Sequence, residues 1–112
     1  MTMNTMELDG FVAIIRYDPE KDRFRGEIQG LNGGADFYGT TPKELRREFR
    51  ASLDFFIATC EKHGIPVKKP SSGKFVVRIP SELHAQASIA AQAAGVSLNA
   101  LVEQAIRHEI HA

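Results

Sequence analysis

The five aspartates of the chain are the residues that could carry hydrolytic chemistry: Asp9, Asp18, Asp22, Asp36 and Asp54. Cleavage of a phosphodiester by carboxylates requires several of them to hold a divalent cation together. Asp18 and Asp22 flank a turn signal, PEKD, where aspartate is common for conformational reasons alone. We therefore expect no enzymatic activity. The alternative is a metal-dependent nuclease, which predicts that this chain by itself cleaves RNA.

Histidine and cysteine offer no clear ligand set for a metal. His108 and His111 stand at positions i and i+3, a spacing that can chelate, but no third ligand is near them in the sequence. His63 and His84 are isolated, and the single cysteine, Cys60, falls among the apolar positions of a predicted helix. A lone cysteine forms no internal disulfide and fits a reducing compartment. We expect no metal, no cofactor and a cytoplasmic location.

The stretch KFVVRI, residues 74–79, is best suited to bind nucleic acid. Neighbouring residues of a strand face opposite sides, so one face holds Lys74, Val76 and Arg78, and the other holds Phe75, Val77 and Ile79. A two-stranded ribbon fits the major groove of DNA, where lysine and arginine donate hydrogen bonds to guanine. We predict that the cationic face contacts DNA. The alternative is an exposed strand whose charges only prevent aggregation.

Two short helices are predicted after this strand. We expect Ser81 to cap a helix that runs to about Ala94. Gly95 ends that helix, and Ser97 caps the second one. The start of the second helix offers backbone N–H groups that suit a DNA phosphate, at Ser97, Leu98 and Asn99.

This part of the chain is too small to fold alone. A unit of about forty residues rarely buries enough apolar surface, and a lone strand leaves both edges unpaired. The simplest solution is a two-fold dimer in which two strands pair antiparallel and four helices close a shared core. The predicted dimer core consists of Phe75, Val77, Ile79, Leu101, Val102 and Ile106.

Length and composition limit the class of protein. With 112 residues, a net charge of zero and 43% apolar residues, the chain has room for one ordinary globular domain or two very small ones. No apolar run reaches the ~20 residues of a membrane span, and the N-terminus lacks the features of a secretory signal. The linker-like VKKPSSGK, residues 67–74, separates predicted domains at 1–70 and 71–112.

The first predicted domain has the pattern of a small α+β fold. Residues 10–18, 23–28 and 35–38 read as three antiparallel strands. Thr41 and Pro42 start a helix over 42–63 that covers the sheet. Its apolar stripe consists of Leu45, Phe49, Leu53, Phe56, Ile57 and Cys60.

The tail resembles a known DNA-binding fold. Its strand, the RIP sequence, the glycine turn and SLNALVEQAI are similar to the ribbon-helix-helix domains of the Arc and MetJ repressors, over residues 74 to about 110. The resemblance implies that Lys74, Val76 and Arg78 read bases, and that Ser97, Leu98 and Asn99 anchor phosphates.

Nearly the whole chain resembles the HicB family of antitoxins, through GFVAIIRYDPEKDRFRGEIQGL, FYGTTPKELRREFRASLDFFIATC and the tail. This resemblance implies a cut-down, RNase-H-like N-terminal domain that binds a small mRNA-cleaving toxin of the HicA type. It also implies that the tail represses the operon by binding double-stranded operator DNA, as a homodimer or as a tetramer of two dimers.

Two other readings remain open at this point. A stand-alone ribbon-helix-helix transcriptional regulator would bind DNA without a toxin partner. A pure protein-interaction module would bind no DNA and would be indifferent to replacement of Arg78.

Overall fold

The computed structural model describes residues 4–111, which form an α+β fold in two compact units. The boundary between the units lies between Ser72 and Gly73, two residues after the predicted one. Residues 1–3 and 112 lie outside the described residues. The predicted domain ranges include all four of them, and the prediction that the N-terminus is not a secretory signal includes the first three. Within the described part of the chain, no helix is long and apolar enough to cross a membrane.

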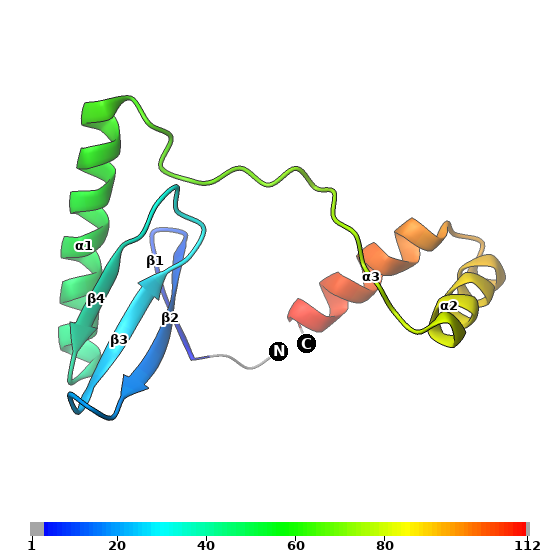
Figure 1. Ribbon diagram of the computed structural model, residues 1–112, viewed down its shortest axis with the longest axis horizontal. Helices are drawn as coiled ribbons and strands as arrows, with labels where there is room; N and C mark the ends of the chain where they lie inside the picture. The colour runs from blue at the N-terminus through cyan, green and yellow to red at the C-terminus, as the bar shows by residue number, and fades with distance from the viewer. Residues whose placement is uncertain (1–3, 112) are drawn as a thin grey trace. The chain divides into compact units, whose positions relative to one another are not determined.

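The N-terminal unit contains an antiparallel sheet with the strand order β1-β2-β3-β4 (Figure 1). Its strands are β1 (Thr5–Leu8), β2 (Phe11–Asp18), β3 (Arg23–Ile28) and β4 (Asp36–Gly39). The predicted α+β class and antiparallel sheet are therefore confirmed. The prediction of three strands is wrong, because β1 adds a fourth.

The missed strand is held by a tight hairpin. Leu8 pairs with Phe11, and the turn residues Asp9 and Gly10 both have positive φ, 52° and 81°. Asp-Gly with positive φ at both positions is typical of the two-residue turns that join antiparallel strands. This dipeptide was the signal for β1. Alternation over the four residues of β1 is a weak signal in the sequence. The strand is also too short to persist without its pairing with β2.

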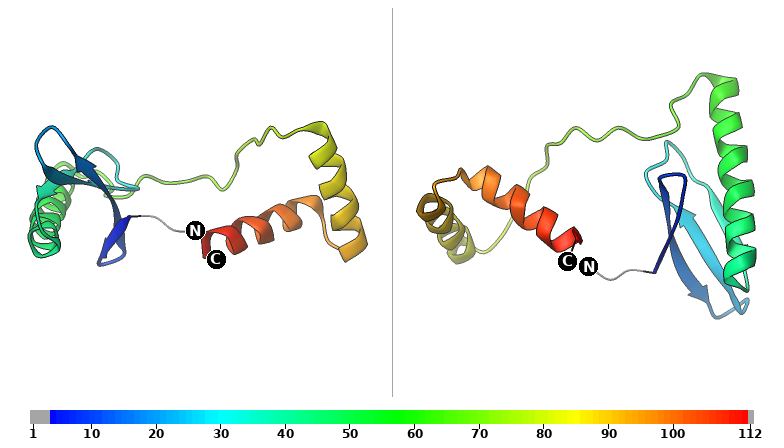
Figure 2. Two further views of the ribbon diagram at one scale, coloured as in Figure 1. Left: turned by 90° about the horizontal axis from the view of Figure 1, so that it is seen from below. Right: turned by 180° about the vertical axis from the view of Figure 1, so that it is seen from behind.

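Helix α1 (Pro42–His63) covers one face of the sheet and packs mainly against β4 (Figures 1 and 2). It has the predicted bounds: the Thr41 side chain accepts a hydrogen bond from the Glu44 amide at 3.1 Å, and Gly64 ends the helix at φ 65°. The ring of Phe49 stacks on Phe37 of β4, with 4.8 Å between centroids. The core of this unit consists of Ala13, Ile28, Leu31, Phe37, Leu45, Phe49 and Leu53.

One strand glycine is required by this packing. Gly26 of β3 pairs with Phe37 of β4, and the Phe37 ring lies where a Cβ on Gly26 would stand. Any larger residue would displace the ring from its stack on α1. Gly26 therefore allows the sheet to approach the helix closely.

The predicted linker is shorter than its sequence indicates. The Asn32 amide donates to the Val67 carbonyl and the Lys69 amide donates to the Gly30 carbonyl, both at 2.9 Å. Val67 also packs against the core of the N-terminal unit. Residues 67–69 therefore belong to that unit, because the side chain of Val67 and two backbone hydrogen bonds hold them there.

The C-terminal unit contains α2 (Ser81–Ala94) and α3 (Leu98–His111). The prediction that Ser81 caps α2 is wrong: Ser81 is the first helical residue, and Pro80, with φ −55°, stands at the cap without a side-chain hydrogen bond. Gly95 ends α2 at φ 71°, and the Ser97 hydroxyl accepts a hydrogen bond from the Ala100 amide at 3.0 Å, as a cap of α3 should.

Candidate DNA-binding and dimerisation surface

The predicted strand at 74–79 does not form a strand in the single chain. No strand is assigned there, and all six residues are exposed. A strand is defined by ladder hydrogen bonds to a neighbouring strand, so a segment whose neighbouring strand belongs to a second chain does not form a strand in one chain. The ribbon remains a prediction.

The apolar residues of this segment face α3 across an open groove, which we call the apolar groove. Phe75 and Val77 line it on one side, and Leu98, Val102 and Ile106 of α3 line the other. Its volume is about 1000 Å³. Four members of the predicted dimer core therefore meet at one surface: Phe75, Val77, Val102 and Ile106. Ile79 and Leu101 do not line the groove.

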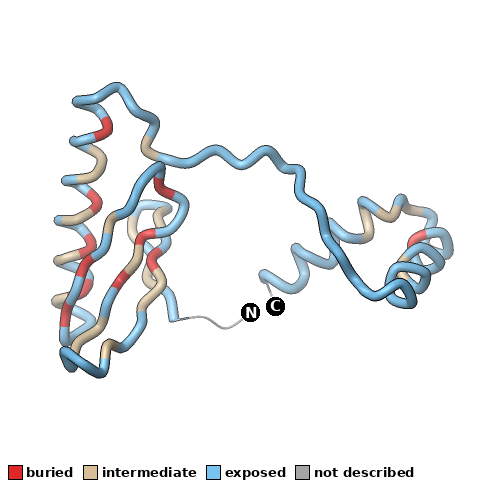
Figure 3. Tube along the Cα trace, in the orientation of Figure 1, coloured by how far each residue is buried: buried red, intermediate tan, exposed pale blue. Residues whose placement is uncertain are grey.

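These side chains are poorly covered in the single chain. Phe75 is 71% exposed, Val77 55% and Ile79 43%. Val102 and Ile106 are 39% and 38% exposed, and Leu101 is half-buried. Ala91 is the one buried residue among 73–111, which explains the almost uniformly exposed trace of this unit in Figure 3. The C-terminal unit thus lacks a core of its own.

The predicted base-reading residues are exposed, as contact with DNA requires. Val76 is 87% exposed, and neither Val76 nor Arg78 lines the apolar groove. Lys74 does line it, beside Phe75, so Lys74 is less clearly separated from the apolar side than the other two. Val76 and Arg78 are therefore separated from the groove-lining Phe75 and Val77, whereas Lys74 is not.

The predicted phosphate-binding residues stand at the start of α3. Ser97 occupies the cap position, and Leu98 and Asn99 are the first two helical residues, whose amides have no intrahelical acceptor. Asn99 is exposed, whereas Leu98 is half-buried and lines the apolar groove. Leu98 therefore contributes its side chain to the groove, and only its backbone remains suited to a phosphate.

Two charged residues that the sequence analysis did not identify also line the apolar groove, Glu103 and Arg107. Asn99, Glu103 and Arg107 line it from α3, and Arg107 donates to Glu103 at 2.9 Å. Glutamate four residues before arginine on a helix is a recognised stabilising pair, and this spacing was a usable signal. A lining that combines large apolar side chains with a few charged ones is compatible with a protein interface.

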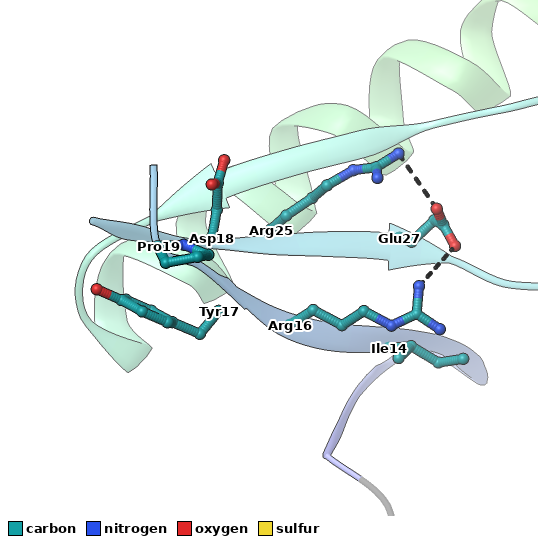
Figure 4. Close-up of a pocket in the computed structure, with 7 residues that line it drawn as sticks. All are labelled: Ile14, Arg16, Tyr17, Asp18, Pro19, Arg25 and Glu27. Atoms are coloured by element: carbon teal, nitrogen blue, oxygen red, sulfur yellow. Dashed lines mark ion pairs between the residues drawn. The ribbon is translucent and has the colours of Figure 1, made fainter. Parts of the chain in front are cut away.

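The N-terminal unit presents the other face of its sheet, opposite α1. Figure 4 shows Arg16 and Arg25 reaching toward Glu27 from two sides, with closest distances of 3.8 Å and 3.2 Å. Arg25 also bonds Asp36, and this hydrogen bond raises the pKa of the Arg25 guanidinium above its usual value. Cations and carboxylates therefore alternate across this face and compensate one another.

The aspartates considered for catalysis have structural partners instead. Asp9 accepts from Arg50 at 2.7 Å, Asp22 accepts from the Tyr17 hydroxyl at 2.6 Å, and Asp18 accepts from the Glu20 amide. Among residues 4–111, no three or more histidine, cysteine, aspartate or glutamate side chains are grouped so that they could hold a metal ion. Cys60 is buried on the core side of α1.

Comparison with known proteins gives one match. The model of the HicB family matches residues 56–106, which include the end of α1, the connection, the 74–79 segment, α2 and most of α3. Neither a curated protein nor a solved structure matches the chain. The matched residues include the whole of the apolar groove except Arg107. Over these residues the chain is similar to the HicB family.

Proposed function

We propose that this protein is the antitoxin of a HicA/HicB-type toxin–antitoxin system. In this proposal the C-terminal unit dimerises as a ribbon-helix-helix and represses its own operon by binding operator DNA. The N-terminal unit neutralises a small mRNA-cleaving toxin. The HicB family match supports an antitoxin at the family level. The observation that carries the proposed dimer and its DNA binding is the exposed apolar groove between the 74–79 segment and α3.

Dimerisation follows from the energetics of that groove. Five large apolar side chains line it, and the unit has a single buried residue among 73–111. The free energy of unfolding of such a unit is small, because few apolar atoms are removed from water within one chain. It increases if a second copy covers the groove. Pairing of two 74–79 segments would also add backbone hydrogen bonds between the two chains.

Operator binding by this dimer would depend on few charges. The unit's cations Lys74, Arg78 and Arg107 are balanced by glutamates, and Arg107 is engaged with Glu103. Phosphate contacts by backbone amides at the start of α3 would carry much of the positioning. We therefore expect the binding constant to depend only weakly on salt concentration. Binding of a tetramer of two dimers would increase the affinity for the operator.

Toxin binding is assigned to the N-terminal unit. The candidate surfaces are the sheet face opposite α1 and the outer edge of β1, which stands at one end of the strand order. Tyr38 is 37% exposed on that face, whereas its neighbour Phe37 is buried and is excluded as a contact. We propose that this unit has no catalytic activity of its own and acts by covering the toxin's RNA-binding surface.

Two experiments on the full chain test this function. Co-expression with the adjacent open reading frame should yield a complex with a small protein that is toxic when expressed alone. Gel-shift with DNA from upstream of the operon should show a discrete complex that resists nonspecific competitor. DNA binding without a co-purifying toxic protein would support the stand-alone regulator, and cleavage of RNA by the chain alone would support the nuclease.

A further inference from the structure

Val76 is an apolar side chain exposed to water, with a cation two residues before it and another two residues after it, Lys74 and Arg78. It is 87% exposed, the highest value among the surface-exposed large apolar residues of 4–111. Its neighbours Phe75 and Val77 line the apolar groove, but Val76 does not. A second copy seated on the groove would therefore cover the neighbours and leave Val76 exposed. Its methyl groups gain from burial only if a different ligand covers them.

The chemistry of valine limits which chemical groups of a ligand could cover Val76 favourably. Valine has no hydrogen-bond donor or acceptor, so it would strip water from a polar base edge without replacing the lost hydrogen bonds. The major groove displays one apolar group, the 5-methyl of thymine, and the minor groove displays none. A valine between two guanine-reading cations therefore matches a thymine methyl better than any other base feature.

We propose that Val76 reads the 5-methyl group of a thymine in each half of the operator. This inference rests on the DNA-binding function proposed above and assigns that site a base preference. Lys74 and Arg78 remain the hydrogen-bonding readers on either side. Because the dimer presents Val76 twice, the operator contains two such thymines related by its symmetry.

The test uses the full chain and a duplex selected from a random DNA pool by repeated binding. Each thymine of the selected duplex is then replaced by deoxyuridine, which removes only the 5-methyl group. Burial of one methyl-sized group predicts about a fourfold weaker binding for one symmetric position, and about fifteenfold for both. In a second duplex, cytosine replaces the critical thymine, which also removes the methyl group. Replacing this cytosine by 5-methylcytosine should restore part of the lost affinity.

The Val76→Ala variant, tested on the thymine and deoxyuridine duplexes, completes a double-substitution cycle between the side chain and the methyl group. It should bind the thymine and deoxyuridine duplexes with nearly equal affinity, and sedimentation should show that it keeps the dimer. Should it fail to dimerise, Val76→Thr, which has a similar shape and one methyl fewer, takes its place. Equal sensitivity to deoxyuridine in wild type and variant, or no sensitivity in wild type, overturns the role of Val76 while leaving DNA binding intact. Failure to select any sequence overturns the DNA-binding function itself.

Discussion

Replacement of Val77 by aspartate tests whether a second copy covers the apolar groove. Val77 is 55% exposed in the single chain, so about half of its surface is still available to be buried by a partner. Full burial of valine is worth ~1.5 kcal/mol, which leaves about 0.8 kcal/mol per copy and about 1.6 kcal/mol per dimer to be lost. Burial of a carboxylate adds several kcal/mol per copy. We expect Val77→Asp to weaken the dimer by roughly 5 kcal/mol or more, which is more than a thousandfold in Kd.

The matched control is the same substitution one residue earlier. Val76→Asp places the carboxylate on the side away from the groove, where exposed like charges cost at most about 1 kcal/mol. Sedimentation equilibrium of the full chains gives the two dissociation constants, and hydrogen exchange of the 74–79 amides reports pairing directly. A dimeric Val77→Asp protein with protected amides would refute the assignment of faces. Wild-type chain that sediments as a monomer, with rapid exchange at 74–79, would refute the dimer.

Three further predictions concern the DNA contact and the N-terminal unit. Lys74→Ala combined with Arg78→Ala should abolish operator binding in a gel shift and keep the dimer, since neither side chain belongs to the proposed core; retained sequence-specific binding would contradict the ribbon. Gly26→Ala should lower the free energy of unfolding of the N-terminal unit by about 1–3 kcal/mol through overpacking against its aromatic neighbour on β4, and Gly34→Ala, which meets nothing within 4 Å, is the control in thermal denaturation. The Tyr17 phenol should ionise above its usual pKa of 10.0, because its hydrogen bond to an aspartate favours the protonated form. Folding then raises the pKa of Tyr17, so the stability linked to its protonation is present below pH 10.0 and is lost as the pH rises through the pKa of the folded protein. Ultraviolet titration measures this pKa, and an unchanged titration midpoint of Tyr17 after removal of Asp22 would contradict the prediction.

Local patterns predicted the elements whose stabilising contacts are close in sequence. Helix α1 begins and ends where its cap, proline and glycine predict, and β3 has its predicted bounds. The apolar stripe of α1 identified Leu45, Phe49 and Leu53 as core residues. The same reasoning placed the cap of α3 at Ser97, because a serine cap bonds an amide three residues away.

Features that depend on distant residues were missed or misplaced. The pairing of β1 with β2, the close approach of Gly26 to Phe37 and the hydrogen bonds that attach residues 67–69 to the N-terminal unit all join separate segments. Ser81 was misassigned for a different reason: serine is a good cap, but the restricted φ of Pro80 lets the helix begin directly after it.

The sequence by itself determined the alternation of residues 74–79, the two helices that follow and the small size of this unit, because each depends only on residue type, spacing and length. Tertiary structure alone decided that Phe75 and Val77 face Val102 and Ile106 across an open groove. It also decided that Asp9 and Asp22 are bound to Arg50 and Tyr17. The physical reason is that periodicity specifies which face of an element a side chain occupies, whereas contacts across elements depend on how the chain folds back on itself.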